Sequence, residues 1–416
     1  MHQTLKNLTA CLAGAGVAAA LSFVGVEAQA PTPAGFRAHE IAQIRGGYAV
    51  AVADFNKDGR LDVIANSLSV PEVAWHENPS WQRHVIVGDT SGIVNQAMAD
   101  INGDGVPEVA FQSSFAMQAK NSAGLNWIAF SQGGDPLQPW KVQQIDKFET
   151  SHHVAWADLD GDGKLEVVNA PLIGPGSLGP TYDQDKASLF WYGQDGWKRG
   201  IMDDRTIPGI IHRVRPVRWD ADNRDEILLA SFEGVALYRS SGTGSAMKFT
   251  KEILTPGHVE KAPRLGASDV GVGTTNGRRI LGTVEPWHGN EVVVYTDAGG
   301  KWQRRVIFDK VASGHEIAVL DLNGDNRADL VANDNSRINP NNPNANATPG
   351  VHVFFSPADP ATGEWVYRRI ETQSGMNGCV GADMNNDKRP DLVCTGSGAV
   401  IKWYENLGPE SASSGN

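Results

Sequence analysis

The sequence is poor in cysteine, in long apolar segments and in basic charge. Of its three cysteines, Cys379 and Cys394 lie far from Cys11 and lack the spacing of a zinc site. The formal net charge is −12, with 36 basic and 48 acidic residues, which argues against nucleic acid and anionic membranes as partners. Beyond the N-terminal segment, no stretch is long and apolar enough to span a bilayer. We therefore expect an acidic globular protein without a membrane span or a cysteine-bound zinc ion.

Several common catalytic signatures are also missing. No serine lies in a G-x-S-x-G turn, and no glycine-rich loop has the pattern of a phosphate-binding site. Paired carboxylates of the glycosidase type cannot be singled out, because most acidic residues belong to repeated turns. Any functional site must therefore be found from the repeats themselves.

The N-terminal residues 1–30 are predicted to form a secretory signal peptide. Lys6 precedes an apolar run over residues 21–26, and residues 28–30 (Ala-Gln-Ala) offer small side chains for cleavage before Pro31. We therefore expect the protein to be secreted or periplasmic.

Seven times the chain runs from an apolar strand into an aspartate and a short acidic turn. These anchors recur at intervals of 46 to 62 residues and are Asp54, Asp100, Asp158, Asp220, Asp269, Asp321 and Asp383. A second β-rich strand follows each turn, a third carries aromatic residues, and a fourth usually opens on tryptophan, as in WQRHVIV. Four short strands in a repeat of this length are typical of a β-propeller blade.

The two ends of the chain predict how the ring closes. GFRAHEIA, near the N-terminus, reads as a fourth strand without its own blade, and VIKWYEN, near the C-terminus, as a third strand without a fourth. We therefore expect an all-β, seven-bladed β-propeller over residues 31–408, in which the N-terminal strand completes the last blade and leaves no open edge. Residues 409–416 are expected to be a disordered tail. Cys379 and Cys394 flank the last turn, so a disulfide or two buried thiols would both fit.

Five of the turns have oxygen ligands spaced as in a calcium loop. In the turn that begins at Asp158, carboxylates fall at positions 1, 3, 5 and 9, and Gly163 allows the sharp bend. The closing acid lies at position 9 between strands, whereas an EF-hand places it at position 12 between helices. The alternative is that aspartate and asparagine only build the turns through their own hydrogen bonds. The predicted structural Ca²⁺ ligands are Asp54, Asn56, Asp58, Asp62, Asp100, Asn102, Asp104, Glu108, Asp158, Asp160, Asp162, Glu166, Asp321, Asn323, Asp325, Asp329, Asp383, Asn385, Asp387 and Asp391.

The Asp220 turn is shortened and the Asp269 turn has lost its acids, so we expect no ion in either.

Histidines gather at the other end of the first strand of each repeat, roughly 20 Å from the turn. Read blade by blade, these positions hold Tyr48, Asn95, Gln96, His152, His153, His212, Arg213, His258, Lys261, His315, Glu316 and Asn377. Loops between the second and third strands open on the same face and add Tyr182, Glu285, Trp287 and His288. Because the chain has only 11 histidines, this concentration predicts one site, although a single histidine is more often an ordinary hydrogen-bonded residue.

Neutral imidazoles beside acidic side chains suit proton transfer or a transition metal such as Zn²⁺ or Mn²⁺. The expected catalytic residues are His152, His153, His212, His288, His315, Arg213 and Tyr48. The expected substrate-binding residues are Asn95, Gln96, Tyr182, His258, Lys261, Glu285, Trp287 and Asn377.

The acidic turns resemble the FG-GAP and VCBS-type repeats of integrin α-subunit propellers and of many secreted bacterial proteins. A narrower resemblance, to the propeller part of aldos-2-ulose dehydratase (1,5-anhydro-D-fructose dehydratase), lies in residues 151–176, 210–220, 284–295 and 313–325. That family eliminates water from keto-sugars, and the resemblance implies active-site roles for His152, His153, His212, His288 and His315. The fungal enzyme continues into cupin domains, so the resemblance also leaves open a protein partner that completes the pocket, or a pocket rebuilt from long loops.

We therefore expect a secreted carbon–oxygen lyase that performs β-elimination on a keto-sugar or uronate. Tyr182 and Trp287 could stack on a sugar ring or only pack. The expected roles are proton abstraction by His153 or His212, enolate stabilisation by a metal, Arg213 or Lys261, and protonation of the leaving oxygen by His288 or His315. The alternative is a non-catalytic propeller that binds carbohydrate or protein, as a lectin or adhesion module does. The rim residues differ from blade to blade, which favours a single site over repeated binding pockets.

Overall fold

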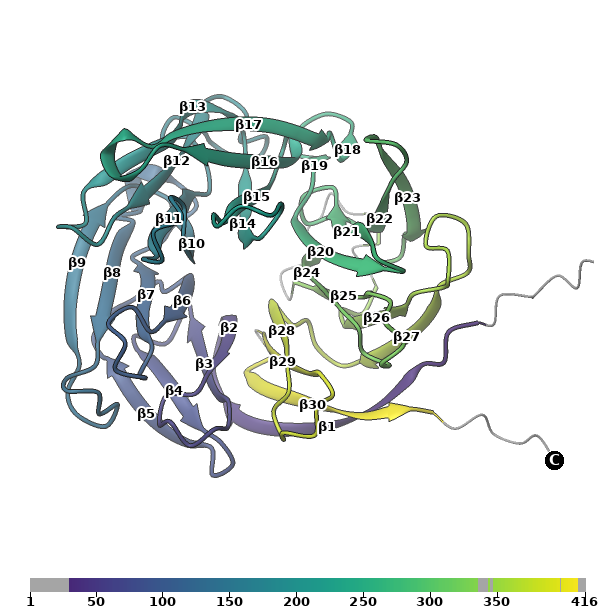
Figure 1. The fold of residues 1–416 in the computed structure, drawn as a ribbon, viewed down its shortest axis with the longest axis horizontal. Coiled ribbons are helices and arrows are strands. Elements are labelled where there is room, and N and C mark those ends of the chain that lie inside the picture. Colours follow the sequence, from purple (N-terminus) through teal and green to yellow (C-terminus); the bar gives the residue numbers. More distant parts are fainter. Residues whose placement is uncertain (1–29, 336–342, 345–346, 397, 411–416) are drawn as a thin grey trace, which may run out of the picture.

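The chain folds into seven four-stranded antiparallel sheets arranged around one axis (Figure 1). The structure, a computed structural model, describes residues 30–335, 343–344, 347–396 and 398–410. The predicted signal peptide, apart from Ala30, and most of the predicted tail lie outside these residues. No helix of the described chain has the length and apolar character needed to cross a membrane. The seven-bladed β-propeller expected from the repeats is therefore confirmed.

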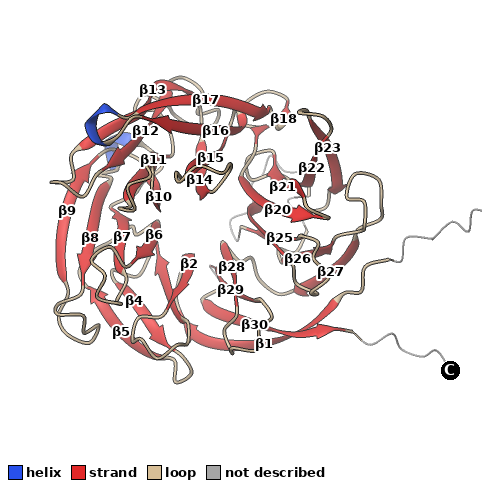
Figure 2. Cartoon of the chain, viewed as in Figure 1, coloured by secondary structure: helices blue, strands red, loops and turns tan. Residues whose placement is uncertain are grey.

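Each blade runs outward from the axis through four strands (Figure 2). The innermost strands are β2 (Gly47–Ala53), β6 (Asn95–Ala99), β10 (Ser151–Ala157), β14 (Ile211–Val217), β20 (Asp269–Thr275), β24 (Gly314–Leu320) and β28 (Gly378–Ala382). The second strands are β3 (Asp62–Ser67), β7 (Glu108–Ser113), β11 (Glu166–Pro171), β15 (Glu226–Ser231), β21 (Arg278–Glu285), β25 (Asp329–Asp334) and β29 (Asp391–Gly396). The third strands are β4 (Val73–Glu77), β8 (Leu125–Phe130), β12 (Lys186–Tyr192), β16 (Gly234–Ser241), β22 (Glu291–Asp297), β26 (Val351–Phe355) and β30 (Val400–Pro409). The outermost strands are β5 (Gln82–Val87), β9 (Lys141–Lys147), β13 (Arg199–Pro208), β17 (Lys248–Thr255), β23 (Trp302–Phe308), β27 (Val366–Glu371) and β1 (Ala34–Gln43).

Three small elements lie outside the blades. A two-stranded hairpin, β18 (His258–Val259) and β19 (Leu265–Gly266), connects blades 4 and 5. Two single-turn 3-10 helices occupy Ala119–Asn121 and Gly244–Ala246.

The last blade is assembled from both ends of the chain. β1 pairs antiparallel with β30, with Phe36 opposite Asn406, so the N-terminal strand is the fourth strand of blade 7. This closure confirms the prediction made from the two unpaired end segments and removes the exposed sheet edges. In the same blade a disulfide joins Cys379 on β28 to Cys394 directly opposite on β29.

The blades are held together by apolar second strands and by buried polar contacts. β3, β7, β11, β15, β25 and β29 are buried along their whole length, because each faces a neighbouring blade on both sides. Tyrosines on third strands also donate hydrogen bonds to carboxylates of the preceding blade. Tyr238 reaches Asp203 at 2.8 Å, and Tyr404 reaches Glu371 at 2.7 Å. These contacts make the ring a rigid frame on which the rim residues are placed.

Blade 5 corrects one predicted turn. Asp269 does not follow the innermost strand but begins it, at the end of the blade opposite the acidic turns. The turn is instead a two-residue hairpin, Asn276-Gly277, with φ of 53° and 72°. Asparagine followed by glycine between two strands is the usual signal for such a hairpin, so the turn was readable from the sequence.

Candidate functional site

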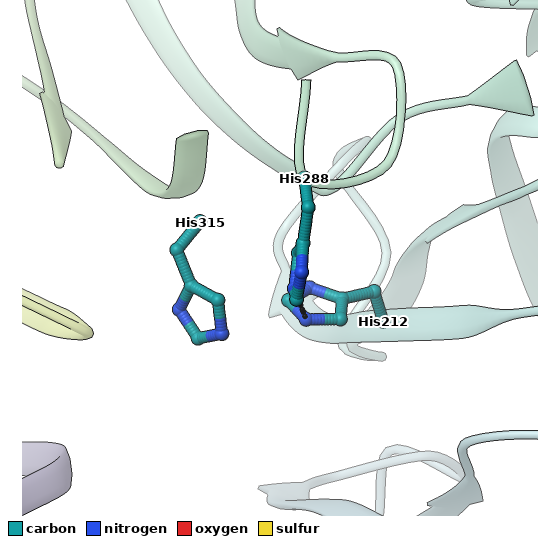
Figure 3. Close-up of side chains that lie close together, drawn as sticks. All are labelled: His212, His288 and His315. Atoms are coloured by element: carbon teal, nitrogen blue, oxygen red, sulfur yellow. Dashed lines mark hydrogen bonds between the residues drawn. The ribbon is translucent and has the colours of Figure 1, made fainter. Parts of the chain in front are cut away.

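Three histidines from three blades converge at the rim of the propeller. His212 lies on β14, His315 on β24, and His288 on the loop between β21 and β22. One ring nitrogen of each lies within 4.8 Å of the others, and Figure 3 shows the side chains reaching toward one another from separate segments. The ring centroids are 4.8 to 5.1 Å apart. We call His212, His288 and His315 the histidine cluster.

Backbone carbonyls fix the orientation of two of these rings. His212 Nδ1 donates to the carbonyl of Ser268 at 2.8 Å, and His315 Nδ1 donates to the carbonyl of Asn377. Each ring therefore turns its Nε2 lone pair toward the cluster. His315 Nε2 is buried and has no hydrogen-bond partner among the described residues. His212 Nε2 lies 3.1 Å from His288 Nε2.

All three imidazoles are held in the neutral form. Burial, followed by the proximity of neighbouring imidazoles, lowers the pKa of His212 and His288 well below the usual value. Burial and the proximity of His288 do the same for His315. A neutral imidazole keeps a lone pair on one ring nitrogen, and this is the form in which histidine binds metal.

A fourth histidine and a tyrosine stand beside the cluster. The His152 ring on β10 lies 5.4 Å from the His212 ring, and its Nε2 is 3.1 Å from the hydroxyl of Tyr48 on β2. The Tyr48 ring meets the His315 ring edge-on at 5.5 Å. Burial, and then the charge of Arg213, lowers the pKa of His152 to about 3. Five side chains from five blades thus surround one small region.

The residues that directly follow the histidines on the innermost strands belong to a separate ionic network. The Arg213 guanidinium donates to His153 Nε2 at 2.7 Å and pairs with Asp269 at 3.1 Å and with Glu316. Arg215 also pairs with Asp269. Because neighbouring residues on a strand point to opposite sides, His152 faces the cluster and His153 faces Arg213. Arg213 and His153 are therefore engaged with each other and with buried carboxylates.

The two aromatic residues expected beside the site pack against each other. Trp287 is 8% exposed, its ring stacks on His288 at 4.5 Å, and Tyr182 and Phe232 meet it edge-on. This burial favours the packing alternative for Trp287, and sugar stacking stays a prediction. Phe115, which no motif of the sequence singles out, lies 5.2 Å from the His152 ring.

Glu285 and the rim amides are bound to neighbouring groups. Glu285 is fully buried and accepts hydrogen bonds from Thr283, Tyr295 and Arg304, so protein groups already engage its carboxylate, and its contact with substrate stays a prediction. Asn95 accepts from the amide of Val154 on the next blade.

Two more amides make similar contacts between blades. Gln96 donates to the carbonyl of Ala49 at 3.4 Å, and Asn377 donates to the carbonyl of Gly47 at 2.7 Å. These residues position the innermost strands around the cluster.

His258 and Lys261 do not lie where the repeat predicted. Both belong to the β18–β19 hairpin and its tip, because the first strand of blade 5 begins later, at Asp269. His258 pairs with Glu260 at 3.1 Å and Glu291 at 3.2 Å, and Lys261 is exposed. No contact in the described chain joins either residue to the histidine cluster.

The acidic turns lie at the far end of the innermost strands, and their geometry fits both readings of the sequence. In the Asp158 turn, the Asp158 side chain accepts from the amides of Gly161 and Gly163, as in an ordinary aspartate turn. Asp158, Asp160 and Glu166 nevertheless bring carboxylate oxygens within 4.8 Å of one another. Burial, and then the neighbouring carboxylates, raises the pKa of Glu166 to about 7.

Other turns differ in detail. Asp220, Asp222 and Glu226, in the turn expected to be empty, form a similar acidic group within 4.8 Å. In three of the five predicted calcium turns an arginine at position 7 pairs with the aspartate at position 5. These pairs are Arg60 with Asp58, Arg327 with Asp325, and Arg389 with Asp387.

Comparison with known proteins identifies the repeat. Residues 54–111, from the first acidic turn to β7, match the FG-GAP-like repeat. No protein with a curated description matches the chain. Among solved structures, a luciferin-regenerating enzyme is similar over 91% of this chain and 97% of its own, with 10% identity and a TM-score of 0.46. A likeness at that level says nothing about activity, and the resemblance to aldos-2-ulose dehydratase stays a prediction.

Proposed function

We propose that the protein is a secreted, metal-dependent carbon–oxygen lyase that performs β-elimination on a keto-sugar or uronate-type carbohydrate. The observation that carries the proposal is the convergence of His212, His288 and His315, whose ring nitrogens approach within 4.8 Å. The blades differ at the rim, and this arrangement occurs once among the described residues, whereas a repeated binding module would present equivalent pockets on several blades.

The residues of the cluster fit a transition metal. Metal-binding histidines usually donate their second ring N–H to a carbonyl, which orients the ring and raises its basicity. His212 and His315 both do so. The buried Nε2 of His315 lacks a protein partner in the described chain, as a ligand atom would. Three imidazoles favour Zn²⁺, with Mn²⁺ the other expected ion.

A bound ion of this kind would supply Lewis-acid polarisation of the substrate carbonyl. The remaining chemistry falls to the protein. The Tyr48 hydroxyl, bonded to His152 Nε2, would give its own proton to that imidazole as it takes the proton beside the carbonyl. The same pair would then return one proton to the leaving oxygen as the C–O bond breaks and the C=C bond forms. His153 is less suited to this role than the sequence indicated, because its Nε2 already accepts from Arg213.

The proposal also includes export through residues 1–30 and structural Ca²⁺ in the five acidic turns. Burial, and then the neighbouring carboxylates Asp325 and Asp321, raises the pKa of Asp329 to about 8. Bound calcium would relieve the repulsion among these carboxylates. The ion would then act on stability and not on the reaction.

The decisive experiment is a search for an unsaturated product. Purified protein loaded with Zn²⁺ or Mn²⁺ is incubated with keto-sugars and uronate-containing oligosaccharides, and ultraviolet absorbance of the conjugated product is followed. His288→Ala should abolish the signal, whereas His39→Ala, on the outer strand β1, should retain it. Absence of product from every substrate, or equal activity of His288→Ala, would overturn the proposal and favour a carbohydrate- or protein-binding propeller.

A further inference from the structure

A small hollow lies between blades 1 and 2, on the same face as the histidine cluster. Its volume is about 250 Å³, and its lining includes Asp89, Thr90, Phe111, Ser114 and Trp127. The connection from β5 to β6 forms one side, and β8 with the start of the β7–β8 loop forms the other. The hollow is below the roughly 300–1,000 Å³ of sites for drug-sized ligands, so it suits a single small ring.

The floor of the hollow is an aromatic surface. The Trp127 ring is partly exposed and lies nearly parallel to Phe111, at an angle of 10° and a centroid distance of 6.2 Å. Its indole N–H donates to Ser113 Oγ at 2.9 Å, which fixes the ring in place. The fixed indole offers its π face to a ligand, which the C–H groups of a sugar ring can cover.

The wall of the hollow is mixed: Val87, Leu125 and Val142 are apolar, several hydroxyls are polar, and Asp89 is the one charged group of the lining. The side chains of Asp89, Thr90, Ser91 and Ser114 make no hydrogen bond within the described residues. Asp89 and Ser114 have φ of 53° and 55°, in the left-handed region that non-glycine residues seldom adopt. Residues with such strained backbone conformations are common at ligand sites, where the surrounding structure holds them in place.

The chemistry of the hollow selects the ligand. No lysine or arginine lines it, so a phosphate or a carboxylate would find no counter-charge. An apolar ligand would leave the hydroxyls and the carboxylate without partners. We propose that the hollow binds one neutral sugar unit, with its C–H face on Trp127 and its hydroxyls on Asp89, Thr90 and Ser114.

The hollow is connected to the histidine cluster through consecutive residues. Ser114 lines the hollow, and Phe115, the next residue, contacts the His152 ring at 5.2 Å. Trp127 lies on the third strand of its blade, two strand spacings or about 10 Å outward from the innermost strand. This inference rests on the proposed lyase function. The distance between the two places then suits an oligosaccharide substrate, with one unit at the cluster and a neutral unit in the hollow.

Binding is tested first, without any reaction. Calorimetric titration of the full protein with neutral gluco-, xylo-, manno- and galacto-oligosaccharides should reveal at least one ligand. Asp89→Asn combined with Thr90→Ala, two changes outside the core, should weaken that binding about tenfold, and Trp127→Ala should weaken it further. Asp195→Asn, an exposed acidic residue elsewhere, is the matched control and should bind like the unaltered protein.

The sugar-site proposal would be overturned if the hollow variants bind the sugar as tightly as the unaltered protein does, or if none of these sugars binds. Because Trp127 also packs on the core, circular dichroism must show that Trp127→Ala is folded. If that variant is unfolded, the binding measured with the Asp89/Thr90 double variant is the test of the sugar site. His288→Ala should still bind the oligosaccharide. If the protein binds a neutral oligosaccharide but releases no elimination product from any keto-sugar or uronate, the lyase proposal is refuted and the sugar site stands.

A kinetic comparison tests the chain-length inference. The hollow variants should lose more catalytic efficiency on oligosaccharides than on a single keto-sugar, through a higher KM. An equal loss on both would contradict the link between the hollow and the cluster.

Discussion

The two faces of this propeller are built by opposite rules. On one face, an acidic turn recurs in every blade except blade 5, and its first aspartate accepts from the same backbone amides, as at Asp158 and Asp321. On the other face, the equivalent positions hold different residues, and those from several blades meet at one point. Repetition on a symmetric ring provides structure that every blade needs, whereas divergence creates a single asymmetric site.

The two faces also differ in how charge is handled. At the rim, the imidazoles are buried and neutral, and the guanidinium of Arg213 is balanced by Asp269 and Glu316. On the turn face, Arg218 pairs with Asp158 at 3.7 Å, yet burial, and then the neighbouring carboxylates, raises the pKa of Glu166 to about 7. We therefore expect a transition metal to govern activity at the rim and calcium to govern stability at the turns.

The largest expected effect comes from removing a cluster ligand. His315→Ala deletes an oriented imidazole and should lower kcat/KM roughly a thousandfold, about 4 kcal/mol of transition-state stabilisation. Steady-state kinetics with the substrate found above measures this loss. His39→Ala is the control and should keep its kcat/KM. If His315→Ala lowers kcat/KM less than fivefold, the reaction takes place elsewhere.

Changing the proton-handling pair should have the next largest effect. Tyr48→Phe removes the hydroxyl bonded to His152 and should lower kcat about 100-fold, because positioned acid–base groups contribute at least that much. The metal content should stay the same, since Tyr48 is not a member of the cluster. If metal and activity fall together, Tyr48 has only a structural role.

Calcium removal should affect stability and leave the rim metal in place. Adding Ca²⁺ at about 100 times its Kd should stabilise the protein by about 2.7 kcal/mol for each site of that affinity. Differential scanning calorimetry with and without Ca²⁺ measures this shift. Asp158→Asn with Asp160→Asn should make it smaller, and an unchanged melting temperature would support the simple turn-building role of these aspartates.

The smallest expected effect sharpens the comparison among the turns. Arg327 pairs with Asp325 and competes with a cation for that carboxylate. Arg327→Ala should therefore tighten Ca²⁺ binding at this turn by up to about 1 kcal/mol, the range of partly exposed ion pairs. Calcium titration of the two proteins gives the difference, and weaker binding by the variant would show that Arg327 supports the loop.

The sequence predicted the fold well because the repeat is a local pattern. Strand, acidic turn and returning strand are adjacent in the chain, so blade number and the closure by β1 could be read from periodicity. The rim residues His152 and His315 could be placed by counting back from intact turns, and His212 by counting back from the shortened Asp220 turn.

Counting back failed where the repeat was interrupted. In blade 5 Asn276-Gly277 replaces the acidic turn, and Asp269, the anchor that the periodicity predicts, lies at the rim. The same shift places His258 on β18 and not on the innermost strand. The choice between His152 and His153 was also out of reach, because it depends on which side of β10 faces the axis and on the bulge between Ser151 and His153.

Metal analysis of the purified protein is the most direct test of the account. X-ray diffraction at the zinc and manganese absorption edges, together with elemental analysis, should show one transition-metal ion bound by His212, His288 and His315. The ion should be lost in His315→Ala and retained when Asp158 and Asp160 are changed to asparagine. A cluster that remains empty after loading with Zn²⁺ and Mn²⁺, or an ion that persists in His315→Ala, would contradict it.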